Sequence, residues 1–294
     1  MQGKGPSKRK RSFLGSKKCA LAVLIILVLA GIAALGIYWL KDKVATPAQA
    51  AESAEALQKA ASTVSGTGNQ FVVSKEQQEQ EAIKEKLRKG QTDGLKVVFL
   101  SFDDGPSENT NAVLDILKEY NVKGTFFTRG REGDVAVAGY KRIVSEGHTL
   151  GNHTYNHVYN LYKQPDAFYA DVQKMDDYEK QITGTEPSKI FRFPGGSANA
   201  NKTCCQGILD RGYNYVDWNV SSGDAAPTTP DVQSIVAAVV GGCHQHSVSV
   251  VLCHAESKAS TREALPQIIT NLKNEGYTFL PMAYDYTYPR QLEP

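Results

Sequence analysis

The pattern of hydrophobic and polar positions divides the chain into three regions. Residues 19–40 form one long apolar run, and residues 41–95 are polar with few large apolar side chains. From residue 96 onwards, short runs of β-branched and aromatic residues alternate with longer amphipathic segments. Short apolar runs bounded by turn residues indicate buried strands, and the longer segments indicate helices. The third region therefore predicts an α/β domain.

We assign this domain to residues 96–288 and regard residues 289–294 as a tail. Strand–helix alternation over about 190 residues is typical of a parallel sheet covered by helices. The expected strands are 96–102, 124–128, 148–152, 189–193, 214–220, 248–253 and 277–281, and the expected helices include 111–120, 135–146, 166–183 and 261–275. Seven strand candidates fit an incomplete barrel better than an eight-fold one, so we predict a distorted (β/α)7 barrel.

The apolar run at residues 19–40 contains no charged residue and is long enough to cross a bilayer, which takes about 20 residues. Residues 1–18 contain seven Lys and Arg and no acid. Positively charged segments that flank a transmembrane helix usually stay in the cytoplasm. Residues 1–18 are therefore predicted to lie there, and we call them the basic cytoplasmic head. We therefore expect a single-pass transmembrane signal anchor in the cell membrane, with an extracellular stalk at residues 41–95 and the α/β domain outside the cell.

A cleaved signal peptide is the alternative for the N-terminal region. Ala48-Gln49-Ala50 resembles a cleavage site. However, the apolar run exceeds the roughly 7–15 residues of a signal peptide and ends well before this site. Within the stalk, Ser74 and Gln77 have the spacing of a capping box, which predicts a solvated helix over residues 76–88.

Charge and cysteine usage narrow the possible partners. The whole chain carries a net charge of +2, and since the basic head contributes +7, the remainder carries −5. The positive balance thus belongs to the head, and we expect no binding to nucleic acid. Cys204, Cys205, Cys243 and Cys253 match no zinc-finger spacing. In an exported domain they can form disulfides, but the sequence gives no pairing, and the adjacent Cys204 and Cys205 can equally stay free.

Candidate chemistry begins where the first expected strand ends. The apolar run 97–102 leads into Asp103 and Asp104 and then into the turn residues Gly105 and Pro106. Neighbouring strand residues point to opposite faces, so the two carboxylates can have different roles. Carboxylates at the rim of a buried strand need a partner, usually a metal ion or an arginine. Taken alone, the two acids are equally consistent with capping of the following helix.

Two histidines follow the third expected strand. His153 and His157 are four residues apart, and on a helical turn both side chains face the same way. With Asp104 they give three ligands and an open fourth position, which is the arrangement that a hydrolytic zinc ion needs for its water. The sequence therefore predicts a divalent metal site at these three residues.

Further polar groups follow the later strands. Arg192 comes after the fourth strand, where an arginine can hold a carboxylate ionised and oriented. Asp224 comes after the fifth strand and His254 after the sixth. In parallel barrels the chemistry lies at the C-terminal ends of the strands, so we expect these groups to meet the metal ligands there.

In this order the motifs resemble those of polysaccharide deacetylases of the NodB-homology type, the family-four carbohydrate esterases, and among them peptidoglycan N-acetylglucosamine deacetylases. The resemblance covers residues 95–285 and rests on five motifs. They are Ser-Phe-Asp-Asp-Gly at residues 101–105, His153 with His157, Arg192 with Pro194, Asp224, and Leu252 with His254. The resemblance implies a distorted barrel and a bound Zn²⁺ or another divalent cation such as Co²⁺, Ni²⁺ or Mn²⁺.

The resemblance also implies a role for each motif residue. The catalytic residues are Asp103 as general base, Arg192 as its brace, His254 as general acid and Asp224 as the residue that tunes this acid. The metal ligands are Asp104, His153 and His157. The expected substrate contacts are Pro194, the backbone N–H of Gly195 at the oxyanion, Leu252 at the acetyl pocket, and Tyr155, which with Tyr159 and Tyr162 is a candidate for stacking on sugars.

Three positions depart from the family pattern. Gly195 stands where many relatives carry an aromatic residue, so an aromatic wall of the groove is expected to be lost. Ala225 stands where tryptophan is common, and Ala255 stands where aspartate is common. These changes affect the substrate groove and leave every catalytic role in place.

The implied activity is metal-dependent removal of N-acetyl groups from cell-wall glycan, with peptidoglycan first and chitin-like oligosaccharides second. Such an enzyme is a hydrolase that acts on carbon–nitrogen bonds other than peptide bonds. An esterase for O-acetyl groups of a xylan-type polysaccharide and a non-catalytic surface glycan-binding protein are the alternatives. Asp103 and His254 argue against the binding protein, because sugar or metal binding alone needs neither. We expect a monomer whose partners are an acetylated glycan and, through its N-terminal helix, the membrane.

Overall fold

The computed structural model describes residues 74–228, 230–256 and 258–294. The predicted basic head, the transmembrane segment and most of the stalk lie outside these residues. Within the described ranges, no helix is both long enough and apolar enough to span a membrane.

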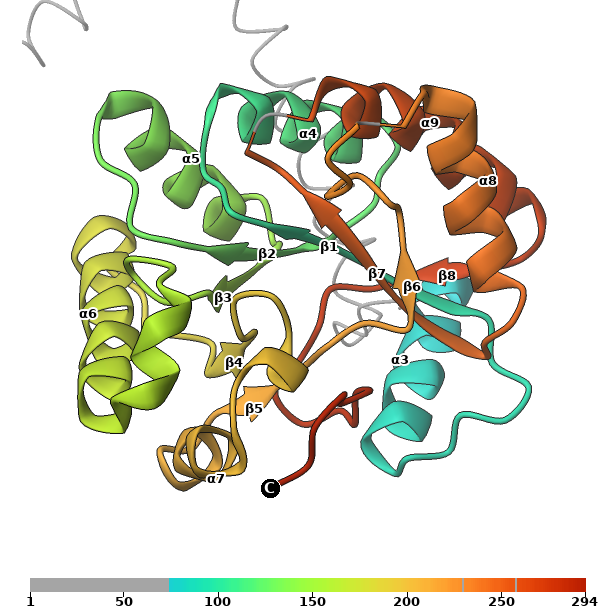
Figure 1. The fold of residues 1–294 in the computed structure, drawn as a ribbon. Coiled ribbons are helices and arrows are strands. Elements are labelled where there is room, and N and C mark those ends of the chain that lie inside the picture. Colours follow the sequence, from blue (N-terminus) through green and yellow to red (C-terminus); the bar gives the residue numbers. More distant parts are fainter. Residues whose placement is uncertain (1–73, 229, 257) are drawn as a thin grey trace, which may run out of the picture. The chain divides into compact units, whose positions relative to one another are not determined.

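The described part is built on a parallel sheet of eight strands (Figure 1). The strands are β1 (Val97–Asp103), β2 (Thr125–Thr128), β3 (Thr149–Asn152), β4 (Ile190–Phe191), β5 (Asn214–Tyr215), β6 (Val220–Ser221), β7 (Val248–His254) and β8 (Thr278–Phe279). Their order is β5-β4-β3-β2-β1-β7-β6, and β8 pairs with the first residues of β1. The result is an α/β half-barrel, which is consistent with the predicted distorted (β/α)7 barrel.

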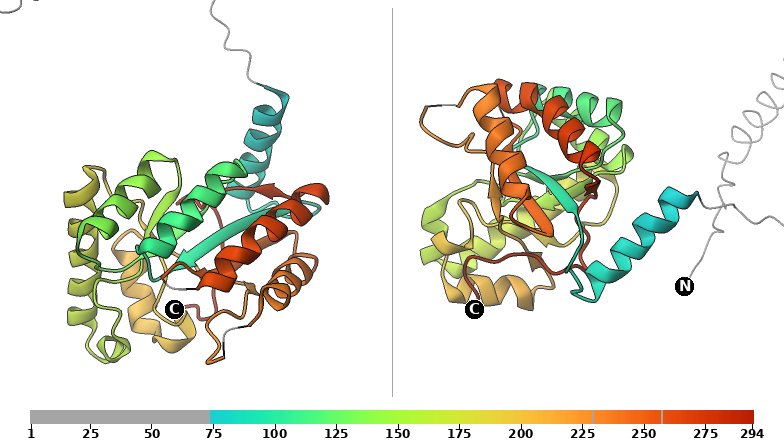
Figure 2. Two further views of the ribbon diagram at one scale, coloured as in Figure 1. Left: turned by 90° about the horizontal axis from the view of Figure 1, so that it is seen from above. Right: turned by 90° about the vertical axis from the view of Figure 1, so that its right-hand side faces the viewer.

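Helices cover the outside of this sheet (Figures 1 and 2). They are α4 (Glu108–Glu119), α5 (Asp134–Ser145), α6 (Pro165–Thr183), α7 (Lys202–Asp210), α8 (Val232–Cys243) and α9 (Ala259–Asn274), with the short 3-10 helices η2 (Tyr159–Lys163) and η3 (Ser197–Asn199). The four helices predicted in this domain lie within one to three residues of their expected bounds. Local hydrophobic periodicity was therefore enough to place them.

Strand β1 positions the candidate site. All seven of its residues are buried, because β2 and β7 flank it and helices cover it. Its parallel register places Asp103 beside His254 at the end of β7 and beside Phe127 of β2. The last residues of the central strands therefore meet at one edge of the sheet.

The prediction of one strand over residues 214–220 is wrong. β5 and β6 form the two opposite edges of the sheet, and residues 216–219 run between them. The backbone N–H of Val216 still donates to Phe191, whereas the Asn219 side chain accepts from the N–H of Val250 at 2.7 Å. The segment thus leaves one edge of the half-barrel and joins the other, which no local pattern reveals.

The helix predicted at the end of the stalk is present as α3 (Lys75–Arg88), and its capping box at Ser74 and Gln77 is formed. Its C-terminal end is not simply solvated. Leu87 is buried, and Arg88 Nε donates to Asp285 Oδ2 at 2.8 Å. The packed domain therefore begins before the predicted boundary at residue 96.

Residues 289–294 are not a free tail. The carbonyl of Pro289 accepts from the N–H of Asp217 at 2.9 Å, and the N–H of Gln291 donates to the Asp217 carboxylate at 2.7 Å. The N–H of Leu292 donates to Ser197 Oγ at 2.9 Å. The C-terminal residues are thus fastened to the two loops that follow β4 and β5.

The four cysteines of the described part are free thiols. Cys204 and Cys205, on the inner side of α7, are buried in a largely aromatic cluster, and Cys243 and Cys253 lie in the main core. They contribute to packing as small apolar side chains.

Candidate active site

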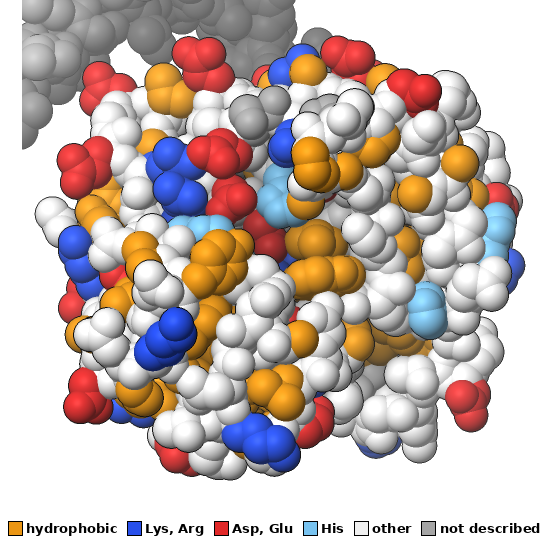
Figure 3. Space-filling model, viewed as in Figure 1, with side chains coloured by type: hydrophobic (Ala, Val, Ile, Leu, Met, Phe, Trp, Pro, Cys, Tyr) orange, Lys and Arg blue, Asp and Glu red, His pale blue; other side chains and the backbone are white. Residues whose placement is uncertain are grey.

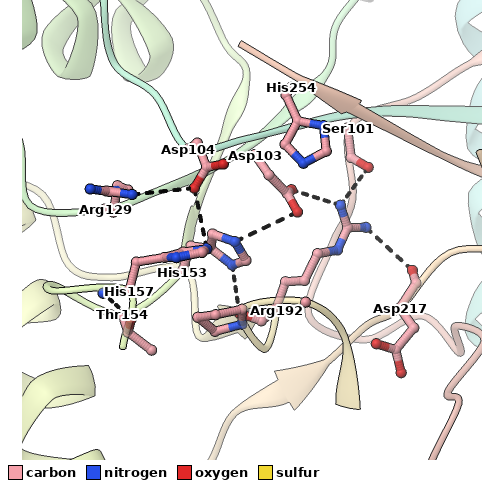
Figure 4. A network of polar contacts seen from close by, with 12 residues as sticks. Ser101, Asp103, Asp104, Arg129, His153, Thr154, His157, Arg192, Asp217 and His254 are labelled. Carbon is pink, nitrogen blue, oxygen red and sulfur yellow. Dashed lines mark hydrogen bonds and ion pairs between the residues drawn. The ribbon is translucent and has the colours of Figure 1, made fainter. Parts of the chain in front are cut away.

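The candidate residues meet at the C-terminal edge of the sheet. The face seen in Figure 3 is hollowed near its centre, where acidic and histidine side chains gather. At this edge of the sheet, Asp104, His153 and His157 come together, and each offers a ligand atom within 4.8 Å of the other two. Asp103, Arg192 and His254 lie together on one side of these three residues in Figure 4.

The two histidines approach Asp104 from a loop that is not helical, so the predicted helical turn is wrong. Thr154 and His157 have positive φ values of 64° and 55°, which bend the loop back on itself. Thr154 Oγ1 accepts from the N–H of His157 at 3.1 Å. The bend brings His157 Nε2 to 3.3 Å from Asp104 Oδ1.

Buried polar partners hold this loop in place. The Asn152 side chain accepts from the N–H of Thr154 at 2.8 Å and donates to Asp176 at 2.8 Å. Asp171 accepts from both the backbone and the side chain of Asn156. Helix α6 supplies both carboxylates, so it fixes the loop that carries the histidines.

The donor set fits a divalent cation. Asp104 Oδ1 is buried and has no hydrogen-bond partner among the described residues. Burial by itself raises the pKa of Asp104, but the three site histidines and Arg129 outweigh it and lower that pKa. Burial and the neighbouring His153 lower the pKa of His157 to about 4, so its imidazole is neutral at neutral pH. One ionised carboxylate and two imidazoles are ligands of zinc and similar ions.

The orientation of the His153 ring also fits the role of a metal ligand. Its Nδ1 contacts the carbonyl of Arg192 at 2.8 Å. That contact leaves Nε2 directed towards the two aspartates, at 3.7 Å from Asp103 Oδ2. A histidine ligand is commonly oriented in this way by a partner of its other ring nitrogen.

Asp103 is held by a fully buried arginine. Arg192 Nη1 donates to Asp103 Oδ1 at 2.9 Å and to Ser101 Oγ at 2.8 Å. The remaining guanidinium nitrogens donate to the carbonyls of Val216 and Asp217. A buried charge pair is tolerated when its other polar atoms are satisfied, as they are here. The other oxygen of Asp103, Oδ2, faces the triad and lies 3.7 Å from His153 Nε2.

His254 is paired with a second buried carboxylate. Its Nδ1 lies 2.8 Å from Asp224 Oδ1, which leaves Nε2 for another partner. Asp224 also accepts from the N–H of His254 and from Thr261 Oγ1. Burial by itself lowers the pKa of His254, but the hydrogen bond to Asp224 and the charges of Asp103, Asp224 and Asp104 raise it above its usual value. The imidazolium form is therefore favoured.

A tight turn after β4 presents a backbone N–H. Gly196 N donates to Phe193 O at 2.8 Å, Pro194 occupies the second position, and Gly195 has a φ of +72°, as in a type II turn. The hydroxyl of Tyr162 donates to Pro194 O at 2.8 Å. Because the C=O and N–H of a trans peptide point in opposite directions, the N–H of Gly195 points away from Tyr162. None of the described backbone hydrogen bonds uses that N–H.

The other predicted substrate residues differ in their surroundings. Leu252 is buried on β7 opposite Ser101 of β1. Tyr155 is engaged by its neighbours, since its hydroxyl donates to Glu132 and its ring packs edge-on against Tyr178. Sugar contacts by Leu252 and Tyr155 stay predictions.

Comparison with known proteins agrees with these motifs. The sequence profile described as polysaccharide deacetylase matches residues 90–216. A peptidoglycan-N-acetylglucosamine deacetylase of Bacillus cereus is 32% identical over 64% of this chain and 87% of its own length. The chain belongs to the polysaccharide deacetylase family.

Solved structures of polysaccharide deacetylases share its fold. The catalytic domain of a peptidoglycan N-acetylglucosamine deacetylase from Eubacterium rectale is 37% identical, with a TM-score of 0.62, over 68% of this chain and 94% of that one. A CE4 esterase of Streptococcus mutans is 33% identical, with a TM-score of 0.60, over 66% of this chain and 89% of that one. The resemblance seen in the motifs is thus confirmed as family membership.

Sequence reasoning missed several residues of this polysaccharide deacetylase site. Arg129 Nη1 lies 3.8 Å from Asp104 Oδ1. Ser101 and Thr261 hold Arg192 and Asp224, and Tyr162 fixes the Pro194–Gly195 peptide by its hydroxyl. Ser101 stood within a recognised motif, and Tyr162 was expected to stack on sugars, whereas it is buried and holds this peptide instead. Arg129 and Thr261 carry no local signal that relates them to the site.

Proposed function

We propose that the chain is a metal-dependent deacetylase that hydrolyses N-acetyl groups of cell-wall glycan, with peptidoglycan N-acetylglucosamine as its main substrate. The observation that carries this proposal is the position of Asp103 and His254. Both flank the triad of Asp104, His153 and His157, and each is held by its own buried partner of opposite charge. Binding of a glycan alone requires neither arrangement.

The named residues supply the steps of amide hydrolysis. A divalent cation bound by the triad would serve as a Lewis acid for the acyl group and the attacking water. Asp103, oriented by its contact with Arg192, accepts a proton from that water. The N–H of Gly195 donates to the developing oxyanion. His254 then donates its proton from Nε2 to the leaving nitrogen.

The environment of His254 favours an amide substrate over an ester. An amine leaves only after its nitrogen is protonated, whereas an alcohol is an easier leaving group. The surrounding carboxylates raise the pKa of His254, so a proton is available to the nitrogen at neutral pH. This argues for N-acetyl groups ahead of the O-acetyl groups of xylan-type polysaccharides.

A panel of acetylated glycans tests the proposal. The full-length chain loaded with Zn²⁺ is incubated with peptidoglycan, with N-acetylglucosamine oligosaccharides and with O-acetylated xylan, and released acetate is measured. We expect release from the first two and much less from xylan. Release from xylan alone would replace the deacetylase by an esterase, and absence of release from all three would overturn the enzymatic proposal.

The Asp224→Asn variant tests the role of His254 through the pH profile. Its amide keeps a hydrogen bond but removes the charge that raises the pKa of His254, so that pKa should fall. Activity needs protonated His254, and the limb at which activity declines at high pH should therefore move to lower pH. We also expect kcat at neutral pH to fall by about 10-fold or more.

Thr261→Val is the matched control for this experiment. It removes one neutral hydrogen bond to the same carboxylate and leaves its charge in place. The high-pH limb of kcat should move less than in Asp224→Asn. An unchanged limb in Asp224→Asn would show that His254 is not the group that titrates.

We further propose that residues 19–40 anchor the chain in the cell membrane with the catalytic domain outside. Support comes from the length of the apolar run and from the basic head that precedes it. Protease added to intact cells should release a soluble fragment that contains the catalytic domain. Recovery of a wholly secreted chain that begins near Ala51 would instead establish a cleaved signal peptide.

A further inference from the structure

Of the three tyrosines that follow His153, only one presents its ring to solvent at the site. Tyr159 is 52% exposed, Tyr162 is buried with its hydroxyl on Pro194 O, and Tyr155 is engaged with Glu132 and Tyr178. The ring of Tyr159 packs edge-on against His157, with ring centroids 5.5 Å apart. Tyr159 therefore adjoins a predicted metal ligand while about half of the residue stays exposed to solvent.

The same ring lies against Gly195 in the turn after β4. A Cβ atom placed on Gly195 would come within 2.8 Å of Tyr159 Cε1 and within 3.4 Å of its hydroxyl oxygen. Real Cβ atoms essentially never approach another atom to 2.8 Å. The glycine thus leaves room for the tyrosine ring in the position that it occupies.

The contact between Tyr159 and Gly195 changes the expected lining of the substrate groove. From the sequence, Gly195 predicted the loss of an aromatic side chain beside the oxyanion N–H. The structure places an aromatic ring there from a different segment, at the start of η2. The ring contacts His157 on one side and lies against Gly195 on the other, so it borders both a predicted metal ligand and the turn that carries the oxyanion N–H.

We propose that Tyr159 is the residue on which a pyranose ring of the glycan stacks, and that it sets the preference of the site for polymeric sugar substrates. One face of a pyranose is covered by C–H groups, and an exposed tyrosine ring offers a flat apolar surface with a hydroxyl at its edge. This inference rests on the proposed deacetylase function and adds a specificity residue to it.

Comparison of a sugar substrate with a sugar-free one tests the stacking role. In the full-length, Zn²⁺-loaded chain, Tyr159→Ala should lower kcat/KM for N-acetylglucosamine oligosaccharides by about 10- to 50-fold, mostly through KM, because it removes a large apolar contact. Hydrolysis of a small aryl acetate should stay within about twofold of the parent, since the groups that act on the acetyl remain.

Tyr284→Ala is the matched control. Tyr284 is 53% exposed, but its backbone carbonyl is bound by Asn214 at the N-terminal start of β5, at the other end of the strands. We expect both kinetic parameters to be unchanged in this variant. Equal kcat/KM for the oligosaccharide in Tyr159→Ala and in an active parent would overturn the stacking role.

Affinity separates this inference from the proposed function. If the parent chain released no acetate from any glycan, the proposed deacetylase function would be wrong. The stacking role of Tyr159 could still be tested, because calorimetric titration measures the affinity for the same oligosaccharide without turnover. Weaker binding by Tyr159→Ala than by the parent and Tyr284→Ala would support the stacking role. Equal binding by all three chains would contradict it.

A double-mutant cycle tests the contact itself. Gly195→Ala adds both backbone strain at a φ of +72° and an overlap with the tyrosine ring. The strain is the same with or without Tyr159, so it cancels in the cycle and leaves the overlap. Gly195→Ala should therefore lower the unfolding midpoint less in the Tyr159→Ala background than in the parent. Equal losses in both backgrounds would show that the ring does not rest on Gly195 in solution.

Discussion

Replacing Asp103 by asparagine should lower kcat for acetate release by roughly 10²- to 10⁴-fold while the metal stays bound. The amide has almost the shape of the carboxylate and still offers an acceptor to Arg192, but it accepts no proton from water. The predicted ligands Asp104, His153 and His157 are untouched. Steady-state kinetics on N-acetylated oligosaccharide and elemental analysis of the same preparation measure both effects.

Asp104→Asn is the matched control, because it makes the same chemical change at the adjacent residue. There the predicted ligand is altered, so both metal content and activity should fall. Asp103→Asn also leaves Arg192 fully buried beside a neutral partner, which we expect to cost about 1–3 kcal/mol in the free energy of unfolding. Near-parental acetate release by a folded, metal-loaded Asp103→Asn chain would remove Asp103 from the role of base.

The sequence predicted those parts of the fold that depend on local pattern. β1 and the helices α4, α5, α6 and α9 have long stretches of regular periodicity, and they lie close to where they were expected. β5 and β6 have two residues each, which is too short for any period, and their pairing is with distant strands. Residues 214–220, in which apolar and polar residues are mixed, were therefore interpreted as one strand.

Long-range contacts explain the other differences. Arg88 at the end of α3 bonds Asp285, 197 residues away, and the C-terminal residues bond the loops after β4 and β5. Such contacts depend on the completed fold. They turn segments that look like a stalk and a tail into parts of the domain.

The site shows the same division between local and distant information. Each motif followed an expected strand, so the sequence indicated that Asp103, His153 and His254 would meet. The family motifs also indicated Arg192 and Asp224 as the partners of Asp103 and His254. They did not indicate that Ser101, Thr261 and Tyr162 contact Arg192, Asp224 and Pro194, because each of these contacts joins two different elements of the fold. The contact between Tyr159 and Gly195 is another example. The sequence shows that residue 195 has no side chain, but only the structure shows that the ring of Tyr159 lies against it.

His153→Ala should reduce bound metal far below one ion per chain and abolish acetate release. The substitution removes one of three predicted ligands, and the remaining Asp104 and His157 hold a cation much less tightly. Because a ligand that binds only the folded state stabilises it, excess Zn²⁺ should raise the unfolding temperature of the parent and leave that of His153→Ala nearly unchanged. Elemental analysis and thermal unfolding with and without Zn²⁺ measure these effects.

His244→Ala is the control for this prediction. His244 is an exposed histidine that directly follows α8, outside the site, and it pairs with Glu275. It should keep the metal and the thermal response. The parent should also release its metal in acid, because the pKa of His157 is about 4 and protonation of the imidazole removes a ligand. Full metal retention in a chain with both His153→Ala and His157→Ala would place the metal elsewhere. The three-residue triad would then have to be abandoned as the metal site.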